Sequence, residues 1–171
     1  MNDIEKMFEE YSDCIYRFCC NISDNLYEAE DLFQDTFLKA MEIEKKLMDV
    51  DHKKSYLIGI ALRLEKNNRR KKARHKRIAP ETRGFDQESD VLESIALDEK
   101  SIEESLIEKE QIAVVRQNML RLEPSYKIIA SLYYGESMQV KEIAEIVKLP
   151  QGTVKSRLHK IRGMLRNGLE D

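Results

Sequence analysis

The residues most able to do chemistry lie close to the C-terminal end of the chain, on one predicted helix. Apolar residues recur there at i, i+4, i+7 and i+11 and form one face: Val154, Leu158, Ile161 and Leu165. A polar and basic face points the other way: Ser156, His159, Lys160 and Gly163, with Lys155 and Arg162 at one edge and Thr153 and Arg157 at the other. Such a helix can enter the major groove of DNA with its first turns at the base edges. The pattern therefore predicts DNA as the ligand.

A shorter helix precedes this one, and the two together have the form of a helix-turn-helix. Ile143, Ala144 and Val147 give the shorter helix one apolar side. Pro150 fits only at the very start of the following helix, where no amide hydrogen is needed. Lys148 occupies the turn, where glycine often provides a left-handed conformation, and we expect a cost on the order of 1 kcal/mol there.

The sequence holds no set of reactive groups that converges on a catalytic site. It has no glycine-rich phosphate loop, no His-x-x-x-His metal pair and no nucleophile elbow. Each histidine lies among lysines or arginines, which is typical of solvated or DNA-facing side chains: His52, His75 and His159. The acids Glu30, Asp31 and Asp35 are spread around a helix and lack a fourth metal ligand. We therefore expect no enzyme activity, no metal and no cofactor.

Composition favours an all-α protein. The 171 residues include only six glycines, three prolines and no tryptophan, which disfavours a β-sandwich or barrel and a single large core. No apolar run approaches the roughly 18 residues of a membrane span, and residues 1–6 lack the layout of a signal peptide. These features predict a cytoplasmic protein that does not insert into a membrane.

The net charge of -3 hides a strong segregation of charge along the chain. Residues 1–35 hold ten acids against two bases, and residues 63–77 hold nine bases against one acid. Residues 86–110 again hold ten acids against two lysines. This distribution predicts a basic partner for the first segment and a phosphate backbone for the second.

Two amphipathic helices are expected in the acidic segment. The first spans about 2–22 and buries Phe8, Tyr11, Ile15, Phe18, Cys19 and Ile22. Asn25 and Glu28 have the spacing of a capping box that opens the second, which runs to about Lys46. Most of the following residues are expected to point inward: Ala29, Phe33, Thr36, Phe37, Ala40 and Met41. Cys14, Cys19 and Cys20 fit neither a disulfide framework nor a zinc site, so Cys19 is expected as a small buried side chain.

A third helix over about 55–76 carries two stripes after a polar loop at 48–53. One stripe is apolar: Leu57, Ile60, Ala61 and Leu64. The other is mostly basic: Arg63, Lys66, Asn67, Arg70 and Arg74. A solvated helix end would also explain such a charge run, but acids that would pair with it at i+4 are missing, which favours nucleic-acid contact. Beyond an acidic linker, four helices are expected over 105–171.

Two stretches resemble the sigma-70 family, and within it the extracytoplasmic-function (ECF, group 4) RNA polymerase sigma factors. Glu28-Ala-Glu-Asp-Leu-Phe-Gln-Asp-Thr-Phe-Leu-Lys-Ala-Met is similar to the family's polymerase-binding helix. Ile143-Ala-Glu-Ile-Val-Lys-Leu-Pro-Gln-Gly-Thr-Val-Lys-Ser-Arg-Leu-His-Lys is similar to its promoter-reading helix-turn-helix. The resemblance implies two small helical domains, region 2 at 1–76 and region 4 at 106–171, joined by an acidic linker at 77–105 that would thread toward the polymerase active-site channel.

The resemblance also implies partners and site residues. Core RNA polymerase would bind Asp31, Gln34, Asp35 and Leu38. The loop at 47–54 would capture a flipped base of the -10 element, and the -10 contacts would be Asp49, His52, Lys53, Lys54, Arg63, Lys66, Asn67 and Arg70. The -35 element would be read by Gln151, Thr153, Lys155, Ser156, Arg157, His159 and Lys160. An anti-sigma factor would be a further partner of the protein.

This chain departs from the family pattern in the third helix. Tyr56 stands where tryptophan is common, Arg63 where asparagine is common, and Asn67 where aspartate is common. Glu65 lies inside the basic helix, where it would either cap a neighbour or weaken phosphate contact. The alternative function is a stand-alone helix-turn-helix regulator of transcription, which would not need the acidic helix at 28–41 to dock on polymerase.

Overall fold

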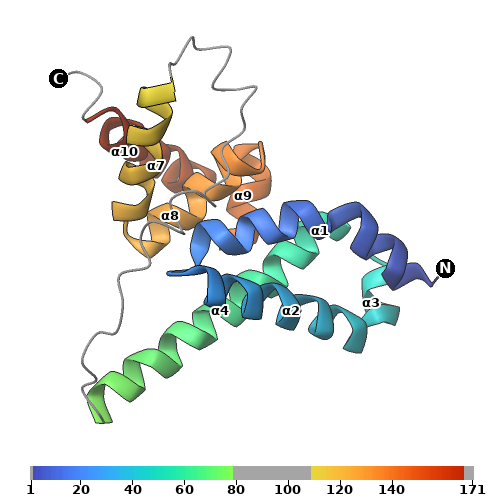
Figure 1. Cartoon of the computed structure of the whole chain (residues 1–171). Helices are drawn as coiled ribbons and strands as arrows, with labels where there is room; N and C mark the ends of the chain where they lie inside the picture. Colours follow the sequence, from blue (N-terminus) through green and yellow to red (C-terminus); the bar gives the residue numbers. More distant parts are fainter. Residues whose placement is uncertain (1, 79–108, 168–171) are drawn as a thin grey trace. The chain divides into compact units, whose positions relative to one another are not determined.

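All regular elements in the described residues are helices, which confirms the expected all-α fold class (Figure 1). The computed structural model describes residues 2–78 and 109–167, and the side chains of 109–112 are not among them. The chain divides into two compact units between Val91 and Leu92. That division and most of the expected linker lie outside the described residues, so the boundaries 1–76, 77–105 and 106–171 stay a prediction.

The first unit contains four helices: α1 (Asp3–Ile22), α2 (Leu26–Glu42), α3 (Glu44–Met48) and α4 (Lys53–Ile78). Helices α1, α2 and α4 all pack against one another. The helix expected to run to Lys46 ends at Glu42, and a new helix follows at Glu44. The polar loop expected at 48–53 is correspondingly short, because α3 ends at Met48 and α4 begins at Lys53.

Side-chain caps explain where the first two helices begin. Ile4 N donates to Asn2 Oδ1 at 3.2 Å and Asn2 N donates to Glu5 Oε2 at 2.9 Å, which completes a capping box on α1. On α2, Glu28 N donates to Asn25 Oδ1 at 2.9 Å. The capping box expected there is only half formed, because the Glu28 carboxylate pairs with Lys72 of α4.

The core of the first unit is drawn from all four helices. Its largest fully buried side chains are Ile15, Phe18, Ile22, Leu32, Leu47, Leu57 and Ile58. Cys19 is fully buried as expected, Cys20 is buried as well, and the three cysteines are free thiols. Burial raises the pKa of the Cys19 thiol, which keeps it protonated.

Two predictions about this core are wrong. Phe8 is 44% exposed and Met41 is 56% exposed, although both were expected to be buried. The Phe8 ring lies at the edge between α1 and α2, with its centroid 4.9 Å from that of Phe37 and 6.0 Å from that of Phe33. One face of Phe8 therefore packs while the rest meets solvent.

The second unit contains α7 (Lys109–Arg121), α8 (Pro124–Ala130), η1 (Ser131–Gly135), α9 (Val140–Val147) and α10 (Gln151–Arg166). Helix α8 opens on Pro124 as expected and continues into η1, a single π-helical turn. Helix α10 packs against α7, α8 and α9. Its predicted apolar stripe is confirmed, since all four members are buried: Val154, Leu158, Ile161 and Leu165.

The turn between α9 and α10 has the predicted left-handed residue. Lys148 has φ 57° and ψ 47°, and its N–H donates to the carbonyl of Ala144. Leu149 N donates to the same carbonyl at 3.1 Å. This closes α9 and lets Pro150 lead directly into α10, so the helix-turn-helix geometry is formed with a lysine where glycine would be unstrained.

Candidate DNA-binding and docking surfaces

Helix α10 presents the polar face that the sequence predicted. Its exposed residues include Gln151, Lys155, Ser156, His159 and Lys160, and Thr153 is half-buried at one edge. Ser156 Oγ donates to Gly152 O at 3.0 Å, which leaves its lone pairs available to a donor. Gly152 and Gly163 have open space where a Cβ would stand, so the backbone is accessible at both ends of this face.

Two arginines at the edges of this face contact tyrosines of the same unit. The Arg157 guanidinium lies over the Tyr126 ring of α8, and that of Arg162 lies over the Tyr133 ring of η1. A hydrogen bond with Tyr134 raises the pKa of Arg162 despite the opposing effect of burial. Arg157 is among the residues predicted to read DNA, and its contact with Tyr126 was not predicted.

Helix α4 carries a cationic surface on its exposed side. The predicted stripe is exposed along its length: Arg63, Lys66, Asn67, Arg70 and Arg74. The last turns add Lys71, His75, Lys76 and Arg77, all exposed, in a stretch that extends past the ends of α1 and α2 (Figure 1). These four were not predicted as DNA contacts, although the charge run of the sequence includes them.

The remaining predicted -10 residues lie in the α3–α4 connection. Asp49 follows α3 directly, and His52 precedes α4, where its carbonyl accepts from Tyr56 N at 3.1 Å. Lys53 and Lys54 belong to the first turn of α4 and are half-buried. The structure thus brings these four residues together at one end of α4, at the N-terminus of the helix that carries the cationic stripe.

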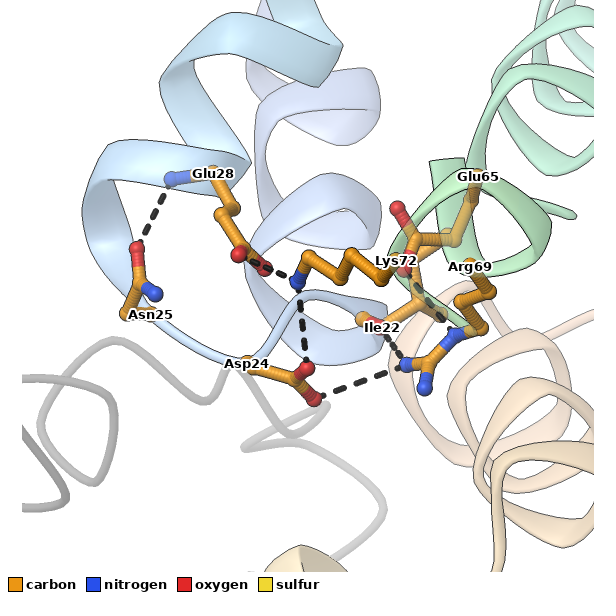
Figure 2. A network of polar contacts seen from close by, with 7 residues as sticks. All are labelled: Ile22, Asp24, Asn25, Glu28, Glu65, Arg69 and Lys72. Carbon is orange, nitrogen blue, oxygen red and sulfur yellow. Dashed lines mark hydrogen bonds and ion pairs between the residues drawn. The ribbon is translucent and has the colours of Figure 1, made fainter. Parts of the chain in front are cut away.

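Arg69 and Lys72 of α4 do not join the cationic surface, because they contact acids of the same unit (Figure 2). Arg69 Nε lies 3.0 Å from Glu65 Oε1, and Lys72 pairs with Glu28. Burial raises the pKa of Glu65 to about 7, although Arg69 and Lys72 oppose that shift. The sequence left two roles open for Glu65, capping a neighbour or weakening phosphate contact. The contact with Arg69 of the same helix favours the first.

Helix α2 exposes a face on which acids and apolar side chains alternate. The predicted residues Asp31, Gln34, Asp35 and Leu38 are all exposed. Tyr27 and Met41 continue the same face at helical spacing and are 71% and 56% exposed. Neither was predicted to belong to this face, although their spacing of three or four residues from Asp31 and Leu38 was a usable signal. Phe8 and Tyr16 of α1 lie beside this face as exposed aromatic side chains.

Known proteins match this arrangement along both units. Residues 7–75 match the family described as Sigma-70 region 2, and residues 113–165 match Sigma-70, region 4. The chain is 32% identical over 162 residues to the ECF RNA polymerase sigma factor SigW of Bacillus subtilis (strain 168). The aligned residues cover 94% of this chain and 86% of SigW. The chain belongs to the ECF RNA polymerase sigma factors.

Further likenesses extend over almost all of this sigma factor. It is 24% identical over 163 residues to the ECF RNA polymerase sigma factor SigM of Bacillus subtilis (strain 168), covering 95% of this chain and 93% of SigM. Its fold is similar to the sigma factor RpoE from Bartonella quintana, co-crystallised with the anti-sigma factor NepR. The TM-score is 0.77 at 18% identity, and the likeness covers 99% of this chain and 98% of that one.

Family membership decides between the two functions that the sequence left open. As a sigma factor, the protein directs promoter-specific initiation of transcription by RNA polymerase. A stand-alone helix-turn-helix regulator would not explain the region 2 match, which includes the whole of α2. Among the helices of the described residues, none is both long and apolar enough to cross a membrane.

Proposed function

We propose that this ECF sigma factor docks on core RNA polymerase through α2 and contacts promoter DNA through α4 and α10. The observation that carries this assignment is the sorting of exposed charge by helix. The exposed face of α2 holds acids and apolar side chains, whereas the exposed faces of α4 and α10 hold cations and amides. Opposite charges on separate helices suit a basic protein surface and a phosphate backbone.

The polymerase-docking face comprises Tyr27, Asp31, Gln34, Asp35, Leu38 and Met41. Its target would be a basic coiled coil of the largest polymerase subunit. Tyr27, Leu38 and Met41 provide apolar area that loses water on docking, and the acids between them set orientation and association rate. We expect the apolar residues to contribute most of the affinity and the acids most of its salt dependence.

The -10 face combines the α3–α4 connection with the cationic stripe of α4. Asp49, His52, Lys53 and Lys54 would surround a base flipped out of the duplex. Extruding that base costs a few kcal/mol, which phosphate contacts next to it can offset. Arg63, Lys66, Asn67 and Arg70 follow along α4 and would bind the backbone and the duplex edge.

The -35 face is the exposed side of α10. Gln151, Lys155, Ser156, His159 and Lys160 are exposed there, and Thr153 and Arg157 lie at one edge. A lysine or arginine suits guanine or phosphate, an amide suits adenine, and a hydroxyl serves either base. Open space at Gly152 would allow the first turn to approach the backbone of DNA closely.

Under this proposal the sigma factor is not an enzyme and carries no cofactor, because the polymerase performs the chemistry. It would act in the cytoplasm, where core polymerase is found. An anti-sigma factor is its expected inhibitor, by analogy with the RpoE–NepR complex. Such a partner would act by covering the docking face of α2 or the DNA face of α10.

Reversal of two charges tests the docking face. Asp31→Lys with Asp35→Lys places two cations against the basic coiled coil, so we expect co-purification with core polymerase to be lost. The matched control is Glu142→Lys with Glu145→Lys, which makes the same charge change on the exposed side of α9. Core binding that survives the α2 reversal, in a protein that remains folded, would contradict the assignment of α2.

A further inference from the structure

We propose that Arg69 and Lys72 are positioning residues that fix the DNA-facing helix α4 against the start of the polymerase-docking helix α2. Together with Asp24, Glu28 and Glu65 they form a group of five charged side chains, named here the α4 clamp (Figure 2). This proposal rests on the functions proposed for α2 and α4. It assigns a role to two cations that would otherwise be counted as part of the DNA-binding surface.

Arg69 ties α4 to the end of α1. Arg69 Nη2 donates to the carbonyl oxygen of Ile22 at 2.9 Å and lies 3.6 Å from Asp24 Oδ1. Ile22 is the last residue of α1, whose last turn contains no basic residue of its own. The guanidinium therefore satisfies an open carbonyl and places positive charge at the negative end of the α1 dipole.

Lys72 ties α4 to the beginning of α2. Lys72 Nζ lies 3.4 Å from Asp24 Oδ2 and pairs with the carboxylate of Glu28 in the first turn of α2. Burial lowers the pKa of Lys72, but Glu28 and Asp24 outweigh that effect and the net shift is upward. From one face of α4, Arg69 and Lys72 thus contact the end of α1, Asp24 of the connection and the first turn of α2.

The clamp face and the DNA-facing stripe lie on nearly opposite sides of α4. Glu65, Arg69 and Lys72 follow one another at i, i+4 and i+7. At 100° per residue, their centre lies about 150° around the helix from that of the exposed cationic stripe. Fixing the clamp face therefore fixes the direction in which Arg63, Lys66 and Arg70 project relative to α2.

The burial of Glu65 favours a positioning role over a simple gain in stability. Glu65 is 4% exposed, and removing a carboxylate from water is costly even when a guanidinium lies beside it. A buried ion pair often contributes little net stability and instead favours one arrangement of its helices over others. In this sigma factor, that arrangement sets the angle between the proposed docking and DNA-binding surfaces.

A charge swap separates positioning from DNA contact. Lys72→Glu places a third carboxylate beside Asp24 and Glu28, and we expect open-complex formation by the holoenzyme to fall about tenfold, within the usual coupling of contacting charges. The double variant Lys72→Glu with Glu28→Lys restores an ion pair of reversed polarity between α2 and α4. We expect it to recover to within about threefold of wild type. If Lys72 instead contacted phosphate, the double variant would stay impaired because a carboxylate would face the DNA, and this result would overturn the proposal.

The salt dependence of promoter binding provides a second readout. Lys72→Gln removes the charge without adding repulsion, and Lys72 is partly exposed, so this variant is expected to fold. We expect it to weaken promoter binding without changing the slope of log K against log salt, whereas Lys66→Ala should make that negative slope shallower by about one. If both variants made the slope shallower by the same amount, Lys72 would be a phosphate contact and the proposed role of the α4 clamp would be overturned. If Lys66→Ala and Arg70→Ala change neither the salt dependence of promoter binding nor open-complex formation, that result contradicts the proposed -10 face and not the α4 clamp.

Discussion

The guanidinium of Arg157 lies over the ring of Tyr126, with Cζ 5.7 Å from the ring centroid. Arg162 lies over Tyr133 in the same way at 5.8 Å. The two arginines flank the buried stripe of α10 on opposite sides, and their tyrosines belong to α8 and η1. We expect these contacts to resist rotation of α10 about its axis. Each is worth about 0.5–1 kcal/mol at exposed positions.

Replacing the ring under Arg157 is therefore expected to weaken promoter recognition. Tyr126→Leu keeps apolar bulk but removes the π face, and we expect affinity for a duplex with the cognate -35 element to fall about threefold. Tyr126→Phe is the matched control, because it retains the face and loses only the hydroxyl. Fluorescence anisotropy of labelled duplex with the full-length protein measures both. Equal losses in the two variants would show that the hydroxyl matters and not the ring.

The two lysines proposed to face the -35 element make a separate prediction. Lys155→Ala and Lys160→Ala are each expected to weaken binding and to make the negative slope of log K against log salt shallower by about one, the value for one phosphate contact. Lys6→Ala on α1 is the control, since Lys6 is also exposed and its ammonium lies 4.0 Å from the carboxylate of Asp3. The slopes are obtained by measuring promoter binding between about 50 and 200 mM salt. Over this range a protein with about six phosphate contacts loses roughly 10³ or more in affinity, so the loss of one contact is measurable. If neither Lys155→Ala nor Lys160→Ala changes the slope of log K against log salt, the two lysines do not belong to the -35 face.

Helical periodicity explains which parts of this fold were predictable. The stripe of α10 and the left-handed Lys148 follow from local rules, and both are confirmed. Phe8 was misplaced because periodicity locates a face but not how far the neighbouring helix covers it. The contact of Arg69 with Ile22 spans 47 residues, so no local pattern could indicate it. The pairing of Glu65 with Arg69, in contrast, is an i,i+4 contact within α4, so the sequence did carry a local signal for that role.

The buried carboxyl of Glu65 predicts a pH dependence of stability. Its pKa is raised from 4.5 to about 7 by burial, with Arg69 and Lys72 lowering it and Asp24 and Glu28 raising it. The charge of Glu65 in turn adds to the effect of burial in raising the pKa of the Cys19 thiol on α1. Because the folded state holds the proton more tightly than the unfolded state, this contribution is complete below pH 4.5 and is lost as the pH rises through 7.

Glu65→Gln is expected to flatten that part of the stability profile. The difference between wild type and variant should change by on the order of 2 kcal/mol between pH 4.5 and 8, with the wild type losing stability as the pH rises. Urea unfolding of the full chain at several pH values measures it. Glu9→Gln, which changes an exposed carboxyl of α1, should leave the profile unchanged. If Glu65→Gln unfolds with the same pH dependence as the wild type, a group other than Glu65 is responsible for that dependence.

The left-handed turn of the helix-turn-helix provides the last prediction. Lys148 adopts φ 57° with an exposed side chain, so Lys148→Gly removes a steric cost and should stabilise the chain by about 1 kcal/mol. Glu145→Gly introduces the same residue into the interior of α9, where φ is helical, and should destabilise by about the same amount. Urea unfolding of the two variants therefore gives shifts of opposite sign. A destabilising Lys148→Gly would mean that Lys148 does not adopt the left-handed conformation in solution, and the entry of Pro150 into α10 would then need another turn geometry.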